Sequence, residues 1–176
     1  NLMAIFLCAR LGYAEIIFDG SLGQAGALPG PDYLIEANRG TLQGNNLFHS
    51  FEQFNLHFGE SATFTGPNPV SNIIGRVTGG SVSSIDGALN STIPDANLYL
   101  LNANGFIFGP NARLNINGSF YLSSADYLRF ADGQQFNTQA STPPVLTIAP
   151  PEAFGFLDNQ PGNITINGSI LNVPVG

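Results

Sequence analysis

The chain has 176 residues, of which 43% are hydrophobic, so it is long enough to bury the core of one domain. Lysine is absent, charged residues are only 10%, and glycine (21) and proline (12) are abundant, which disfavours long surface helices and favours an all-β domain with many turns. The formal net charge is −7 with no basic stripe, which excludes binding to nucleic acid or to an anionic bilayer.

Residues 1–14 are interpreted as the remnant of a secretion signal peptide. The apolar run 2–9 has the length of a signal-peptide core and is too short to span a membrane. A small-x-small cleavage site ends at Ala14, so we expect the mature chain to begin at Glu15. The alternative is a buried strand at the start of the domain. Cys8 is the only cysteine, so a cleaved chain has neither a disulfide nor a thiolate metal site.

The first part of the mature chain predicts short strands followed by an aromatic block. Residues 16–18 and 33–35 are apolar and are joined by a Gly/Pro-rich link, so we expect two short strands that cover one end of the domain. Phe48, Phe51 and Phe54 are spaced three apart, which predicts a short helical turn leading into a strand. We expect these rings in the core rather than on a contact surface.

His49 and His57 are the only histidines. A zinc site would need a third and a fourth ligand nearby, and the sequence offers none. We therefore expect two ordinary imidazoles, either hydrogen-bonded or exposed, and no metal or cofactor.

The middle of the chain predicts closely spaced strands. Residues 72–89 carry apolar side chains between the turn signals Gly79-Gly80 and Asp86-Gly87. In residues 97–125 apolar and polar side chains alternate in three short runs, and Asn, Gly and Pro separate the runs. A period of two predicts strands joined by turns, with no helix.

Residues 126–158 interrupt this regularity. We expect a long-looped hairpin with strands at 127–130 and 145–148, and a polar segment, 132–141, between them. Pro150-Pro151 breaks the strand pattern because proline cannot donate to a ladder. The segment is therefore predicted to lie outside the regular stack.

The order apolar, polar, apolar, Asn, Gly, Ser, apolar occurs at residues 114–120 and again at 164–170. Such a repeat favours a solenoid, in which each coil buries its apolar face against its neighbours. The offset fits two coils of roughly twenty residues plus the hairpin. A β-sandwich gives similar strand spacing and remains the alternative from pattern alone.

Several blocks also resemble one family in order and spacing. Residues 46–55, 73–80, 84–87 and 96–112 resemble the two-partner-secretion (TPS) domain of filamentous-haemagglutinin-type exoproteins, in the version common in cyanobacteria. The likeness runs from about Ile17 to the C-terminus.

The family's hallmark Asn-Pro-Asn-Gly-Ile corresponds to residues 102–106, with two departures. Ala103 replaces the proline and Phe106 replaces the isoleucine. Losing a proline that pre-sets φ costs about 0.4–1 kcal/mol through the freer unfolded chain. The asparagines and the glycine remain, so we expect the turn to survive.

The resemblance implies a right-handed parallel β-helix over residues 15–176, with an N-terminal cap and a small antiparallel sheet outside the stack. It also implies the secretion domain of a large exoprotein or adhesin, exported through the periplasm to the surface of a Gram-negative, cyanobacterial-type bacterium. The implied partner is an outer-membrane transporter of the Omp85 type, which recognises the domain through its POTRA domains. No catalytic residue, cofactor, lipid anchor or transmembrane segment is implied for the mature chain.

The candidate motif residues have two interpretations. They form either a turn presented for transporter recognition or a structural turn whose asparagine side chains satisfy backbone groups, and the second is favoured. The candidates are Asn46, Phe48, Phe51, Asn102, Asn104, Gly105 and Phe106.

The rival function is a β-helix domain that binds or degrades polysaccharide. Such enzymes need clustered carboxylates, either as a catalytic pair or as calcium ligands. The acidic residues here are scattered singly, and there is no Gly-x-Ser-x-Gly elbow or phosphate loop, so we expect no enzyme. A third possibility is direct glycan adhesion, which we expect of chain downstream of residue 176.

Overall fold

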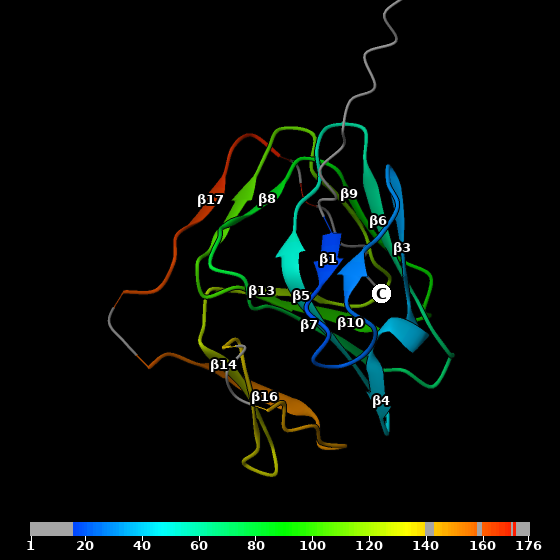
Figure 1. The fold of residues 1–176 in the computed structure, drawn as a ribbon, viewed down its shortest axis with the longest axis vertical. Coiled ribbons are helices and arrows are strands. Elements are labelled where there is room, and N and C mark those ends of the chain that lie inside the picture. Colours follow the sequence, from blue (N-terminus) through cyan, green and yellow to red (C-terminus); the bar gives the residue numbers. More distant parts are fainter. Residues whose placement is uncertain (1–15, 140–142, 158–159, 170, 172–176) are drawn as a thin grey trace, which may run out of the picture.

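The computed structural model describes residues 16–139, 143–157, 160–169 and 171, so the predicted signal peptide lies outside it. The described residues form strands and one 3₁₀ turn, η1 (Ala37–Arg39), with no α-helix. Three sheets wind about four turns of a β-solenoid (Figure 1). The predictions of an all-β chain and of a β-helix are confirmed, and the sandwich alternative is wrong.

Each turn of the solenoid places strands in three sheets in the order A, C, B. The solenoid strands of sheet A, which are parallel to one another, are β5 (Asn46–Phe54), β7 (Asn72–Val77), β10 (Asn97–Leu101) and β13 (Phe120–Ser123). Sheet C contains β8 (Ser83–Ile85), β11 (Phe106–Phe108) and β17 (Ile164–Ile166). Sheet B contains β3 (Asp32–Glu36), β6 (Ser61–Thr65), β9 (Ala88–Ser91) and β12 (Arg113–Asn115).

The first coil carries an antiparallel cap. Strands β1 (Ile16–Phe18) and β4 (Thr41–Gln43) both pair antiparallel with β5, and β2 (Gly26–Ala27) pairs with β1. The edge of β5 opposite β7 is therefore paired rather than left open. The predicted strands at 16–18 and 33–35 are both present, as β1 and β3.

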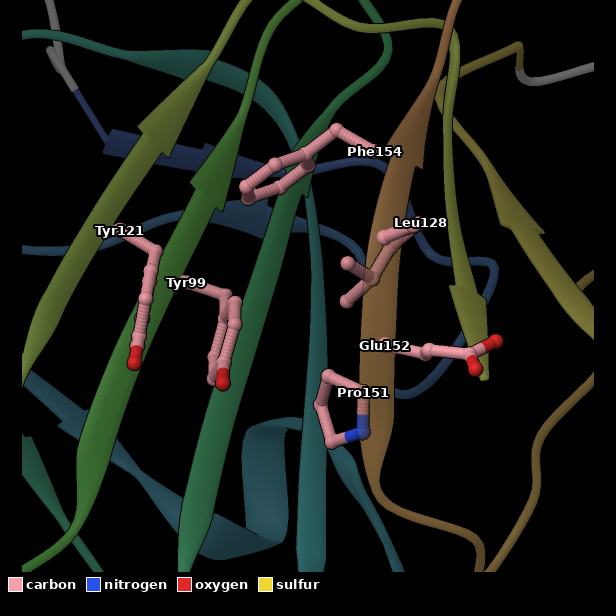
Figure 2. A pocket seen from close by; sticks show the side chains of 7 residues that line it. Tyr99, Tyr121, Leu128, Pro151, Glu152 and Phe154 are labelled. Carbon is pink, nitrogen blue, oxygen red and sulfur yellow. The ribbon is translucent and has the colours of Figure 1, made fainter. Parts of the chain in front are cut away.

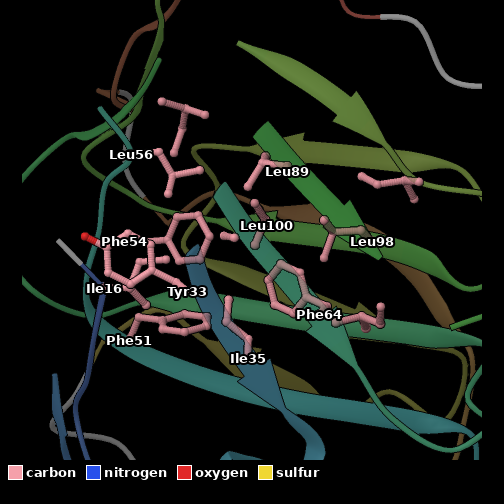
Figure 3. Close-up of a cluster of buried hydrophobic side chains, with 14 of the residues drawn as sticks. Ile16, Tyr33, Ile35, Phe51, Phe54, Leu56, Phe64, Leu89, Leu98 and Leu100 are labelled. Atoms are coloured by element: carbon pink, nitrogen blue, oxygen red, sulfur yellow. The ribbon is translucent and has the colours of Figure 1, made fainter. Parts of the chain in front are cut away.

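Inward-facing side chains of all three sheets form one core inside the solenoid. Phe51 and Leu98 enter from sheet A, Leu89 from sheet B and Leu56 from the sheet C side (Figure 3). All are essentially unexposed. At about 25 cal/mol per Å² of apolar surface, this burial is the main favourable term in folding.

The aromatic block is a single strand, so the predicted helical turn is wrong. Ile17 pairs with Gln53 and Phe18 pairs with Phe51, which leaves Glu52 as an extra residue in β5. A bulge of this kind lets two residues three apart face the same side. Phe51 and Phe54 therefore both enter the core, and helical spacing appears within a strand.

The described residues between 126 and 157 form a three-stranded antiparallel sheet D, so the small antiparallel sheet that the resemblance implies is present, although it is not the two-stranded hairpin expected from the pattern. Its order is β15 (Gln135–Asn137), β14 (Tyr127–Phe130), β16 (Pro151–Gly155). The expected strand at 145–148 is wrong. Pro151 begins a strand at the sheet edge, where its missing N–H costs no ladder bond. The carbonyls of Thr147 and Ala149 instead accept hydrogen bonds from the buried Asn46 amide, at 3.0 and 2.7 Å.

Sheet D covers the outer face of sheet A and makes a second core there (Figure 1). Residues Asn46–Phe51 of β5 and all of β7 are consequently buried on both faces, so their apolar side chains serve both cores and their polar side chains lie inside the protein. The second core contains Phe48, Ile74, Tyr99 and Leu101 from sheet A and Leu128, Phe130 and Phe136 from sheet D.

The two matching segments at 114–120 and 164–170 are not equivalent positions of successive coils. Leu114 pairs with Leu89 in sheet B, whereas Ile164 pairs with Phe106 in sheet C. The interpretation as a repeat is therefore wrong, although both segments run along one stack. The two segments look alike because strands of different sheets in a solenoid are both short, alternate apolar and polar side chains, and end in a turn that Asn and Gly favour.

The true repeat shows in a ladder of asparagines on sheet A. Asn46, Asn72 and Asn97 are in register, 26 and 25 residues apart. Each amide donates to the side-chain carbonyl of the preceding one, at 2.9 and 3.2 Å, and Asn97 accepts from the N–H of Ser119. The stacked amides satisfy one another's hydrogen bonds at positions that are buried or half-buried.

His49 departs from the expectation of an ordinary imidazole. Its ring is fully buried between Phe51 and Phe64, with centroid distances of 6.0 and 5.8 Å. Neither ring nitrogen has a hydrogen-bond partner among the described residues. Burial lowers the pKa of His49 to about 3, because the charged imidazolium would lose its hydration.

We predict an acid-labile fold that depends on His49. In the unfolded chain the His49 imidazole is protonated as the pH falls below about 6.5, whereas in the folded chain it stays neutral down to about pH 3. The free energy of unfolding should therefore fall by about 1.4 kcal/mol per pH unit in that window. Urea unfolding at several pH values should show this slope, and His49→Leu should lose it.

The matched control is His57→Leu, because the His57 side chain is 68% exposed. This variant should keep the wild-type slope. An unchanged slope in His49→Leu would contradict the assignment.

Candidate functional site

The motif turn joins β10 to β11 at the corner between sheets A and C. The N–H of Gly105 donates to the carbonyl of Asn102 at 2.8 Å, which closes the four-residue turn. The turn survives with Ala103 in place of proline, as predicted. Gly105 has φ +95°, and a Cβ on it would lie 2.1 Å from the carbonyl oxygen of Asn163, so only glycine fits.

Asn102 ties the turn to the preceding coil. Its side chain is unexposed, and its amide donates to the carbonyl of Ser81 at 3.0 Å and to the hydroxyl of Ser83 at 2.9 Å. Its side-chain oxygen accepts the backbone N–H of Asn104 at 2.9 Å. Each polar atom of this amide is therefore used inside the stack.

The following coil forms backbone hydrogen bonds with the same turn on its other side. The N–H of Phe106 donates to the carbonyl of Asn163 at 3.0 Å, and the N–H of Gly162 donates to the carbonyl of Ala103 at 3.1 Å. Asn104 is the exposed member, and its amide donates to the carbonyl of Gly79 at 3.2 Å. The turn is thus a joint between three successive coils.

The remaining candidates lie apart from this turn and are buried. Phe51 is in the inner core, whereas Phe48 faces outward against Phe130 and Phe136 of sheet D. Asn46 begins the asparagine ladder. Of the seven candidates, only Asn104 presents an exposed side chain, so a recognition role for any of them stays a prediction.

A buried arginine that is not among the candidate motif residues links three parts of the fold. The Arg76 side chain on β7 is unexposed, and its Nε donates to the Ser50 hydroxyl at 2.7 Å. Its two terminal nitrogens donate to the Asn137 carbonyl in sheet D and to the Ser21 hydroxyl near the cap. The guanidinium also lies 4.7 Å from the ring centroid of Phe136. A lone arginine within an apolar strand was the available signal.

Asp19 supplies the negative charge of this network. Ser50 and Thr78 donate their hydroxyls to its carboxylate at 2.6 and 2.8 Å, and the Ser21 N–H donates at 2.8 Å. Burial raises the pKa of Asp19, but these hydrogen bonds outweigh it and leave the pKa lowered. Burial lowers the pKa of Arg76, and the Asp19 charge partly offsets this effect. The cation and the anion are therefore joined through Ser50.

A cleft of about 170 Å³ opens between sheet A and β16 (Figure 2). Tyr99 and Tyr121 are stacked on its floor, with ring centroids 4.4 Å apart and planes 10° apart. Phe154, 6.4 Å from the Tyr99 ring, points toward them from β16, whereas the Glu152 carboxylate points away. Burial, and then the neighbouring Tyr121, raise the pKa of Tyr99 to about 12.

The described residues hold no group of three or more His, Cys, Asp or Glu side chains that could bind a metal ion. Within the same part of the chain, no helix has the length and apolarity needed to cross a bilayer. The candidate features of the described residues are therefore the hydrogen-bonded motif turn, the Arg76 network and the aromatic cleft.

These features define a capped β-solenoid whose motif residues hold its own coils together. The family described as TPS secretion domain matches residues 14–175, which is nearly the whole chain. The chain therefore belongs to the TPS secretion domain family. No curated protein and no solved structure matches it significantly.

Membership of this family defines the general role. The family is a secretion and targeting module rather than an enzyme family, and it works with a transporter partner in two-partner secretion. The chain is accordingly the secretion domain of an exoprotein secreted by a Gram-negative bacterium.

We predict that Asn102→Ala destabilises the fold by about 1–3 kcal/mol, because it leaves the buried Ser83 hydroxyl and the Asn104 N–H without a partner. Asn104→Ala, at an exposed position, should cost less than about 1 kcal/mol. Urea unfolding of both variants measures this difference. Equal losses would contradict the division between a buried joint and an exposed neighbour.

Arg76→Met should cost about 2–4 kcal/mol, because it removes the donors to Ser50 and Asn137 and leaves Asp19 without its cation. The control Arg113→Met changes an exposed arginine on β12 and should stay within about 0.5 kcal/mol. Both values come from denaturant unfolding. A cost for Arg76→Met as small as for the control would show that the network adds nothing.

Proposed function

We propose that an outer-membrane transporter of the Omp85 type recognises this domain through its periplasmic POTRA domains and that this recognition directs export of an adhesin-type exoprotein. The observation that carries the proposal is the family match over residues 14–175. The solenoid fold supports it, because coils that contact only their neighbours can fold one after another as a chain emerges from a pore.

The covalent chemistry of the chain suits passage through a pore. The sequence has one cysteine, Cys8, so no intramolecular disulfide can lock a bulky intermediate in the oxidising periplasm. The export route through the periplasm to the cell surface, in a cyanobacterial-type bacterium, is part of the proposal.

The burial of the motif limits how a transporter reads it. Asn102, Gly105 and Phe106 are all covered by neighbouring coils, so a partner reaches them only before the coils stack. We assign these three residues to folding and stacking. Asn104 is the one motif residue that a partner can contact on the folded domain.

The charge of the surface favours a basic partner. The net charge is −7 and there is no lysine. Arg76 is buried, Arg39 lies 4.6 Å from the Phe18 ring centroid, and Arg129 pairs with Glu152 at 3.0 Å. The domain therefore presents few unengaged cations, and a basic partner surface complements it.

The decisive test is secretion of this domain with and without the transporter gene from the same locus. Transporter-dependent appearance outside the cell is the expected result. Secretion without any partner would overturn the proposal, and activity on polysaccharides would favour the rival function. Asn104→Ala separates the two motif interpretations: normal secretion makes the motif structural, whereas loss of secretion with unchanged stability makes Asn104 a recognition residue.

We predict that binding to the isolated POTRA domains is sensitive to salt. Raising NaCl from about 50 to about 300 mM should increase the Kd about tenfold, because screening weakens attraction between an acidic domain and a basic partner. Isothermal titration calorimetry measures the change. A Kd that is independent of salt would contradict the electrostatic part of the proposal.

A further inference from the structure

Sheet D stops short of covering sheet A completely. Outward side chains in register form the column Phe48, Ile74, Tyr99, Tyr121 across β5, β7, β10 and β13. The first two are unexposed and Tyr99 is 9% exposed, but Tyr121 is 39% exposed. Sheet D therefore covers sheet A only as far as Tyr99, next to which β16 lies, and leaves Tyr121 partly exposed (Figure 2).

The strand at this boundary has a free edge. In sheet D the order is β15, β14, β16, and among the described residues no strand pairs with the second edge of β16. The other outer strand, β15, is engaged, because its Asn137 carbonyl accepts from Arg76. An unpaired strand edge is a template for another extended segment.

The two faces of β16 specify what such a segment carries. Phe154 and Pro151 lie on the cleft side, next to the stacked tyrosines. The Glu152 side chain lies on the opposite side and is 51% exposed, and its Oε2 pairs with Arg129 at 3.0 Å. A strand beside β16 therefore meets an apolar floor on one face and a carboxylate on the other.

We propose that the free edge of β16 and the Tyr121 floor form a docking site for one extended segment of the transporter's periplasmic part, with alternating apolar and basic residues. Its backbone pairs with β16, its apolar side chains cover Tyr121, and its basic side chains face Glu152. The acidic character of the chain, at net charge −7, favours the same partner chemistry. This inference rests on the proposed function for the identity of the partner.

The first test uses a defined peptide as probe, acetyl-Arg-Val-Arg-Phe-Arg-Val-amide. It should bind the domain and shift the NMR signals of β16 and of Tyr121. The same peptide with alternate backbone amides methylated, or with glutamate in place of arginine, should bind at least about tenfold more weakly, because it loses the backbone pairing or the charge match. Equal binding of all three peptides would overturn the docking site.

Two variants with matched controls locate the site. Tyr121→Glu and Glu152→Lys should each weaken peptide binding about tenfold or more. The controls are Ile107→Glu, at an outward residue of β11 that is also 39% exposed, and Glu36→Lys, at an exposed acid of β3, and both should bind within about twofold of wild type. Thermal unfolding checks that each variant is folded. Wild-type affinity in both site variants would overturn the inference.

The same variants with the isolated POTRA domains distinguish this inference from the proposed function. Weakened binding in the site variants alone supports both. Wild-type binding in every variant overturns the docking site and leaves the proposed function intact. No binding by the wild-type domain overturns the proposed function, while the peptide measurements still decide on the docking site.

Discussion

Burial of sheet A on both faces is the constraint on which the rest of the structure depends. The inner face closes the solenoid core, and the outer face carries sheet D. Residues Asn46–Phe51 of β5 and all of β7 have no face left for water, so their polar groups need partners within the protein, and His49 is the exception that stays neutral instead. Asn46 meets this need through the Thr147 and Ala149 carbonyls in the segment before β16, and Arg76 meets it through Ser50, Ser21 and Asn137.

The polar networks therefore do more than satisfy buried atoms. Arg76 contacts the β1–β2 loop of the cap, strand β5 and sheet D at once, and Asn46 contacts the insertion and the asparagine ladder. Removing one partner from such a network leaves an unpaired buried charge or amide, which costs more than an average contact gives. The cap, the coils and the insertion should consequently be coupled.

Much of the fold follows from local sequence, and the remainder depends on contacts that lie far apart in the chain. Period-two alternation and Asn/Gly corners correctly predict the strands at 97–125 and the all-β class. The spacing of Phe51 and Phe54 misleads because a bulge at Glu52 imitates a helical period. In place of the strand expected at 145–148, the Thr147 carbonyl accepts a hydrogen bond from Asn46, about a hundred residues earlier, and no local pattern reveals that contact.

The candidate site likewise has a part that the sequence predicts and a part that depends on long-range contacts. Residues 102–105 are recognisable as a turn from their types alone, but only the structure shows that the adjacent coils bury it. The cleft combines residues 99, 121 and 154, which come from three separate strands, so sequence spacing gives no hint of it. His49 similarly reads as an ordinary imidazole until its surroundings of phenylalanine rings are known.

The coupling of sheet D to sheet A is tested most directly by native-state hydrogen exchange of the amides of β7 and β14. If two-sided burial makes them one cooperative unit, both sets exchange through the same opening, with equal free energies and equal denaturant dependence. Exchange of the β14 amides through a separate opening of much lower free energy, with β7 still protected, would contradict that coupling.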